Sequence, residues 1–232
     1  MIQLAYNNPH WFYGKDLVID IISAFVPLLI AFFSLRYYKI EKKNKNYLYL
    51  AISFLLIALS FFFKILTNFS IEYNLLEVRN FGFMTVVHNY VKTSDILFVV
   101  GYLIYRALNL LGLYTLYSIY QEQPKSNIFL IVFLIAISTY FSQSSYYMFH
   151  LTALILLSLI TLQYYHNYKK NRQFSAKMLT TSFAIIGASQ IFFMFVHLNQ
   201  VIYVAAEIIQ LMGYLLLLTA FVKVLRNAKK KK

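Results

Sequence analysis

Cysteine is absent from this chain, acidic residues number only eight, and helix-breaking residues are few, with six glycines and three prolines. Without cysteine there is no disulfide, no thiolate metal site, no cysteine nucleophile and no cysteine lipidation. Charged residues make up 12% of the chain, far below the roughly 25% of a soluble domain. These shortages exclude an ordinary soluble protein and leave no room for a soluble domain.

Motifs of enzymes and cofactor proteins are missing too. The sequence has no His-x-x-x-His spacing, no Gly-x-Ser-x-Gly elbow and no glycine-rich phosphate loop. A retinal Schiff base would need a lysine in the middle of the last apolar segment, but Lys223 lies at its end. Haem has weak support, since His150 and His197 lie near the outer ends of different segments. We predict no catalytic site, no metal and no cofactor, neither retinal nor haem.

What the chain has in abundance is apolar sequence, with 60% hydrophobic and 19% aromatic residues. A membrane-spanning helix needs about 20 apolar residues to cross ~30 Å of hydrocarbon. Such stretches fall at 17–38, 47–68, 96–119, 127–142, 145–166, 177–197 and 201–224. The fold prediction is an all-α polytopic membrane protein with seven transmembrane helices. The fourth stretch is the shortest and nearly joins the fifth, so six or eight spans stay open.

Basic residues predict the orientation, because Lys and Arg collect in cytoplasmic connections. Sixteen lie in the connections after the first, third and fifth stretches and in the tail, against three on the opposite side. The N-terminus is therefore expected outside and the C-terminus in the cytoplasm, with residues 1–226 as one domain and 227–232 as a basic tail. The net charge of +13 then indicates anionic lipid headgroups rather than nucleic acid as partners. The N-terminus lacks a signal peptide's basic region, so we expect 17–38 to be retained as the first helix.

One connection, residues 69–94, is long. Loops of this length are usually functional or disordered. This one includes the apolar run FGFMTVVHNY, which favours an ordered segment. A cap over the outer end of the bundle and a merely interfacial segment are equally good interpretations.

Polar residues within the spans line up on helix faces, since residues three, four or seven apart share one face. In 96–119 and the residue before it, Asp95, Tyr102, Arg106 and Asn109 form one such stripe; in 201–224, Tyr203, Glu207, Gln210 and Tyr214 form another. Weaker stripes hold Asp20, Lys64 and Gln190. Charged groups at membrane depth cost about 2.5–3.5 kcal/mol each, so they face the interior and mark functional sites by default.

The functional interpretation is an outward-facing polar pocket for a small anionic ligand, with Arg106 at its floor and Glu207 as its partner. Its predicted residues are Arg106, Glu207, Asn109, Tyr102, Gln210, Gln190, His150 and Asp20. The structural alternative is an ion pair with interhelical hydrogen bonds worth ~0.6–2 kcal/mol each. For Lys64 we expect the long stem to reach the outer interface, and for the histidines an ordinary polar role is favoured over a ligand role.

The opening helix pair, DLVIDIISAFVPLLIAFFSLRYYKIEKKNKNYLYLAISFLLIALSFFFKIL, resembles the seven-helix sensor modules at the N-terminus of prokaryotic signalling proteins. The chain is also similar to uncharacterised archaeal-like seven-helix integral membrane proteins. The resemblance covers the first 70 residues or so and implies a ligand-sensing or membrane-state-sensing domain. It departs from those modules because a lysine-rich tail stands where they have a kinase or cyclase domain.

These observations predict a multi-pass protein of the cell membrane that acts as a receptor or sensor. Any signal would pass to a separate cytoplasmic or membrane signalling partner. A small secondary transporter and a scaffold subunit of a membrane complex are the alternatives. The ligand and the oligomeric state are not encoded in any motif of the sequence.

Overall fold

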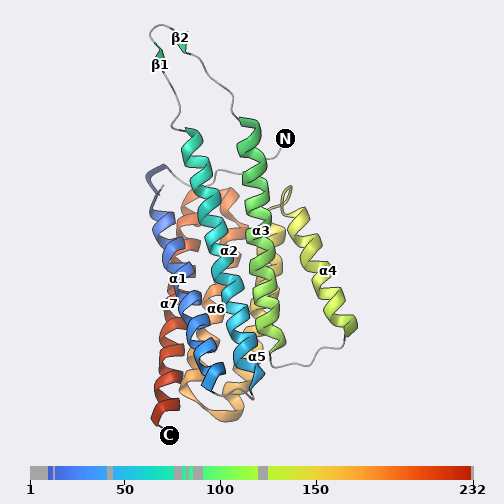
Figure 1. Cartoon of the computed structure of the whole chain (residues 1–232), viewed down its shortest axis with the longest axis vertical. Coiled ribbons are helices and arrows are strands. Elements are labelled where there is room, and N and C mark those ends of the chain that lie inside the picture. The colour runs from blue at the N-terminus through green and yellow to red at the C-terminus, as the bar shows by residue number, and fades with distance from the viewer. Residues whose placement is uncertain are drawn as a thin grey trace.

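The apolar stretches form seven α-helices in the computed structural model of this protein (Figure 1). The structure describes residues 10–12, 14–40, 44–75, 80–81, 84–85, 91–119 and 125–230. Its helices are α1 (Lys15–Ile40), α2 (Lys45–Leu75), α3 (Val91–Ser118), α4 (Lys125–Phe141), α5 (Tyr147–Asn171), α6 (Phe174–Met194) and α7 (Gln200–Lys230). The predicted all-α class is confirmed, and the described residues form seven α-helices; that all seven cross the membrane stays a prediction.

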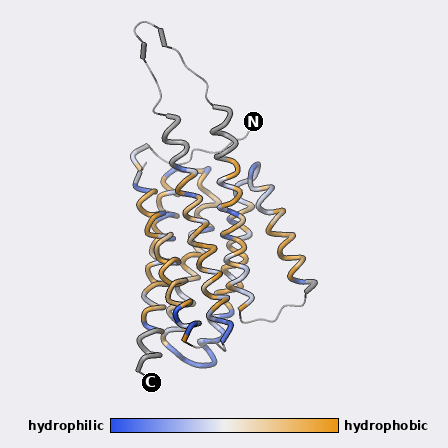
Figure 2. The backbone as a smooth tube through the Cα atoms, in the orientation of Figure 1, coloured by the Kyte–Doolittle hydropathy of each residue, from blue (hydrophilic) through white to orange (hydrophobic). Residues whose placement is uncertain are grey.

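Six of these helices are long and apolar enough to cross a membrane, and α4 is a shorter apolar helix. At about 1.5 Å per residue, the 17 residues of α4 extend about 26 Å, slightly less than a ~30 Å hydrocarbon layer. Hydrophobic residues follow the helices along their length, and hydrophilic residues collect at the end where α1 passes into α2 and α5 into α6 (Figure 2). The protein is therefore a membrane-spanning helical bundle.

Several helices run past the predicted apolar stretches. α2 continues to Leu75 and α3 begins at Val91, so both enter the connection predicted over 69–94. Between them, the two-residue strands β1 (Asn80–Phe81) and β2 (Met84–Thr85) pair antiparallel. The predicted cap otherwise falls outside the described residues. α7 likewise continues to Lys230, into the predicted tail.

The arrangement of the helices brings the first and the last together. α2 packs between α1 and α3, α6 packs between α5 and α7, and contacts of α1 with α7 and of α3 with α5 join the two groups. Two glycines allow close approach: a Cβ on Gly112 of α3 would lie 2.7 Å from a side-chain carbon of Ile57, and one on Gly213 of α7 would lie 2.5 Å from a side-chain carbon of Ile186. α3 therefore packs closely against α2, and α7 packs closely against α6.

Helix α4 stands at the side of the bundle and contacts α3 and α5 (Figure 1). Most of its large apolar side chains are exposed, including Phe129 at 75%, while Ile135 is buried. Ile131 and Ile135 pack against the hydrophobic core, and Ser138 Oγ, near the C-terminal end of α4, lies 2.7 Å from Thr152 Oγ1 of α5. Large apolar side chains exposed over so much surface are rare on soluble monomers, which agrees with a lipid-facing surface.

Candidate functional site: two buried charge centres

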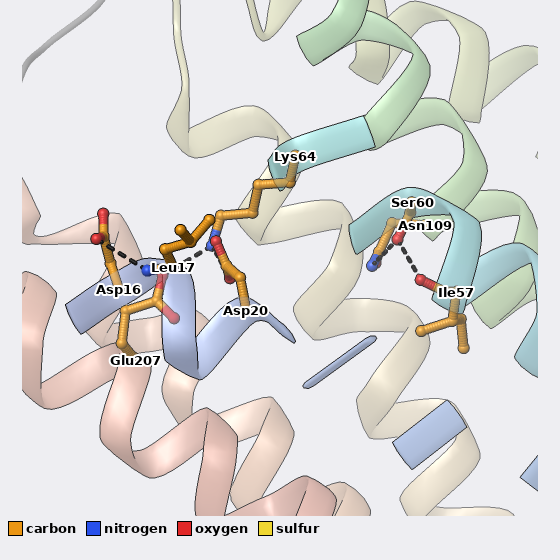
Figure 3. A network of polar contacts seen from close by, with 8 residues as sticks. All are labelled: Asp16, Leu17, Asp20, Ile57, Ser60, Lys64, Asn109 and Glu207. Carbon is orange, nitrogen blue, oxygen red and sulfur yellow. Dashed lines mark hydrogen bonds and ion pairs between the residues drawn. The ribbon is translucent and has the colours of Figure 1, made fainter. Parts of the chain in front are cut away.

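Three charged side chains from three helices meet inside the bundle. Lys64 of α2 places its Nζ 2.7 Å from Oδ1 of Asp20 on α1 and 2.8 Å from Oε1 of Glu207 on α7. The three residues are 6%, 0% and 1% exposed, respectively. Figure 3 shows the lysine stem reaching across to both carboxylates. We call this cluster the acidic centre.

Helical periodicity explains why each group turns inward. On α1 the buried positions include Asp16, Asp20, Ser23, Pro27, Ile30 and Ser34, which recur three or four residues apart. On α2 the buried residues Ser60, Lys64 and Thr67 follow the same spacing. Because α1 and α2 are antiparallel neighbours, Asp20 near the start of one helix lies level with Lys64 in the second half of the other.

The acidic centre carries an excess of negative charge. Two carboxylates share one ammonium, and each accepts only one hydrogen bond from it. The second oxygen of each, Oδ2 of Asp20 and Oε2 of Glu207, is buried without a hydrogen-bond partner among the described residues. With both carboxylates ionised, the centre therefore holds one uncompensated negative charge away from water.

Arg106 of α3 forms the second centre, which we call the arginine centre. Its Nη1 donates to the carbonyl oxygen of Ser142 at 2.6 Å and to the hydroxyl of the same serine at 2.8 Å. The guanidinium carbon lies 5.3 Å from the ring centre of Tyr102 and 5.9 Å from that of Phe149. Arg106 is 6% exposed, and its Nε has no partner within the described part of the chain.

The predicted pairing of Arg106 with Glu207 is wrong. Glu207 contacts Lys64, and in the part of the chain whose side chains the structure describes both ion pairs belong to Lys64. The expectation that Lys64 reaches the outer interface is also wrong, because its side chain is buried between two acids. The physical reason is electrostatic: two carboxylates within hydrogen-bond distance hold an ammonium that would otherwise move to water.

The remaining predicted residues join separate hydrogen-bonded pairs. Asn109 Nδ2 donates to Ser60 Oγ at 3.1 Å, and His150 Nδ1 lies 2.8 Å from Gln190 Oε1. Gln210 is buried on α7, one turn from Glu207. All eight predicted residues thus lie at least partly buried in the bundle, but they are divided among several centres. Their opening to the outer side of the membrane stays a prediction.

Three residues of these centres, Ser142, Phe149 and Lys64, were not predicted. Ser142 lies in the turn between α4 and α5, where the sequence showed only a short polar interruption. Lys64 was recognised in a polar stripe, but its side chain was expected at the outer interface. Lys64 and Asp20 lie at similar depth on consecutive antiparallel helices, and this was the signal that could have predicted their contact. Within the described ranges, no group of three or more His, Asp or Glu side chains is placed to hold a metal ion.

Comparison of the chain with protein-family models, with curated proteins and with solved structures gives no match. The resemblance to seven-helix sensor modules therefore stays a prediction. The features that bear on function are the two charge centres and helix α4, which lies beside the arginine centre.

Proposed function

We propose that this protein is a receptor or sensor of the cell membrane that binds a small anionic ligand at Arg106. The observation that supports this most is a buried guanidinium with no acidic partner among the described residues. Intramembrane charges normally pair with one another or mark a binding site. Glu207, the acid that was expected to neutralise Arg106, is paired with Lys64. An anionic ligand would therefore supply the negative charge that Arg106 lacks.

The electrostatic balance around Arg106 leaves room for such a ligand. Arginine stays protonated in proteins and carries five N–H donors, and burying a charge costs several kcal/mol even after relaxation. Ser142 follows α4, whose C-terminal end carries a partial charge of about −0.5, so the compensation is partial. A carboxylate or phosphate oxygen pair fits the guanidinium fork and would supply the remaining charge.

The position of the site supports a sensing role. The hydrogen bonds of Arg106 to Ser142 join α3 to the turn after α4, and α4 exposes most of its large apolar side chains. An anion bound by Arg106 would neutralise the guanidinium and so weaken its attraction to the two Ser142 oxygens. We therefore expect occupancy to loosen the α4–α5 turn and to move α4 relative to α3 and α5, which is how ligand binding would be reported.

The proposal includes seven spans with the N-terminus outside and the C-terminus in the cytoplasm. It is supported by the collection of hydrophilic residues at one end of the bundle (Figure 2), where Lys39, Lys169, Lys170 and Lys177 lie at helix termini. In the cell membrane this end would face the cytoplasm and its anionic lipids. A separate signalling partner would read the change at that side.

The experiment is a thermal-shift screen of carboxylates, phosphates and other small anions in detergent, with wild type, Arg106→Gln and the exposed-site control Arg36→Gln. An anion that raises the melting temperature of wild type and of Arg36→Gln, but not of Arg106→Gln, supports the proposal. Equal shifts in all three proteins, or no shift in wild type with any anion, would contradict it.

Movement of α4 is measured separately. Because the chain has no cysteine, a spin-label pair at Phe129→Cys on α4 and Leu162→Cys on α5 labels two exposed sites and no others. A ligand identified in the screen should change the distance distribution of this pair. An unchanged distribution with bound ligand would keep anion binding but reject sensing through α4.

A small transporter is the second candidate, and one observation favours it. The acidic centre joins α1, α2 and α7, and Lys64 could exchange between its two carboxylates as these helices move. Uptake of the anion into liposomes that depends on Lys64 and Glu207 would favour transport over sensing. The scaffold alternative loses support, because the polar faces of α3 and α7 meet other helices of the same chain and need no partner helix.

A further inference from the structure

The acidic centre has a charge balance that calls for an occupant of its own. We propose that Asp20 and Glu207 bind one monovalent positive charge in addition to Lys64, either a proton or an alkali-metal ion, on their free carboxylate oxygens. This site lies on α1, α2 and α7, distinct from the arginine centre on α3, and it does not depend on anion binding at Arg106.

The first step is the charge count. Lys64 contributes one positive charge, and Asp20 and Glu207 contribute two negative ones. All three are at most 6% exposed, so water cannot screen the excess. An isolated charge transferred to a low-dielectric interior is costly enough that proteins pair it, coordinate it to a metal or neutralise it.

The second step is the state of the oxygens. Oδ2 of Asp20 and Oε2 of Glu207 have no partner among the described residues, although most buried polar atoms in proteins do. Carboxylate oxygens are the hard donors that alkali and alkaline-earth cations prefer, and they are also the atoms that take up a proton. Both sources supply the same single positive charge.

The third step is to account for the other titratable groups that face the centre. Asp16, one turn from Asp20 on α1, accepts a hydrogen bond from the backbone of Leu17 at 2.9 Å, where the N-terminal end of a helix favours an acid. The remaining neighbours among the described side chains are tyrosines, which are ordinarily uncharged near neutral pH: Tyr203 and Tyr214 on α7, and Tyr102 and Tyr105 on α3. None of them supplies the missing positive charge.

The test uses variants that change the charge balance in opposite directions. Glu207→Gln and Asp20→Asn each bring the centre to neutrality without an occupant, whereas Lys64→Met leaves two negative charges. Melting temperatures are measured in detergent as NaCl, KCl or LiCl replaces choline chloride at fixed pH and ionic strength, and again as pH varies in choline chloride. Arg36→Gln, at an exposed position, is the control outside the centre.

We expect the melting temperature of wild type and of Arg36→Gln to rise with one alkali cation or with falling pH. The rise should be lost in Glu207→Gln and Asp20→Asn and enlarged in Lys64→Met. A response to the cation at fixed pH identifies a metal ion, and a response to pH alone identifies a proton. The proposal would be overturned if the melting temperature of wild type changed with neither the alkali cation nor pH. It would also be overturned if the response persisted unchanged in Glu207→Gln and Asp20→Asn.

A second measurement covers the case in which the variants do not fold. Infrared difference spectra of wild type, taken between choline and the alkali cation and between two pH values, report the bands of carboxyl groups directly. Cation binding should shift a carboxylate band, and protonation should exchange a carboxylate band for that of a protonated carboxyl. A band is assigned to a buried carboxyl group when it is protected from hydrogen exchange in heavy water. If no such band changes in either difference spectrum, the proposal is refuted.

Discussion

The sharpest consequence of the acidic centre concerns Lys64→Met. Methionine keeps the unbranched stem and fills similar space, so the substitution removes the ammonium while the packing stays nearly intact. Two carboxylates then remain buried with no positive partner. If Lys64 reached the interface instead, the same change would be almost silent.

The magnitude follows from the two contacts. Each is a hydrogen bond between charged groups, at 2.7 and 2.8 Å, and such bonds contribute about 1.5–3 kcal/mol each. Removing one partner from a buried ion pair costs about 3–5 kcal/mol, because the charge left behind is uncompensated. We therefore expect Lys64→Met to lower the free energy of unfolding by about 3–5 kcal/mol.

The assay is reversible unfolding in mixed micelles, followed by circular dichroism as the denaturing detergent is increased. Lys169→Met is the matched control, because Lys169 is exposed at the end of α5. Its ammonium lies 5.2 Å from the ring centre of Tyr165, so its change should stay within about 1 kcal/mol. A triple variant with Asp20→Asn and Glu207→Gln added should regain most of the loss, since replacing a whole buried ion cluster is often neutral. Equal costs for Lys64→Met and Lys169→Met would refute the reasoning.

Two further predictions test the packing. Gly112→Ala should destabilise the protein by about 1–3 kcal/mol through overpacking, because its Cβ would lie 2.7 Å from a side-chain carbon of Ile57; Gly187→Ala should be tolerated, because the nearest atom would lie 3.7 Å away. Detergent unfolding of both variants checks this, and a smaller loss at 112 than at 187 would contradict it. Asn109→Ala should cost about 1 kcal/mol by removing the bond to Ser60, and a double-mutant cycle with Ser60→Ala should show the coupling; additive costs would contradict it.

The sequence was sufficient for the helices because their signal is local. Hydropathy located all seven α-helices, since a spanning helix must satisfy its backbone internally and present apolar side chains to lipid. It underestimated their ends, as at Leu75 and Val91, because a helix can extend beyond the hydrocarbon layer with polar residues in its outer turns. Hydropathy reports the membrane boundary, and the helix does not have to end there.

The candidate site was predictable in part. Spacing along one helix showed that Arg106, Asn109, Glu207 and Gln210 face inward, and the structure buries all four. Spacing does not report which helices are neighbours, so it could not show that α1 meets α7 and brings Asp20 to Glu207. The contact between α1 and α7 depends on how all the helices pack together. It determines that Glu207 pairs with Lys64 and not with Arg106.

The pairing of Glu207 with Lys64, and not with Arg106, changes the interpretation of Arg106. Had Arg106 and Glu207 met, one ion pair would have neutralised both, and bundle stability alone would account for them. Instead the acidic centre, with both carboxylates ionised, holds one uncompensated negative charge, while the arginine centre has a cation with only neutral acceptors among the described residues. Two uncompensated buried charges of opposite sign, each costing several kcal/mol, would destabilise the bundle and not stabilise it. We propose instead that they are two binding sites for ions of opposite charge.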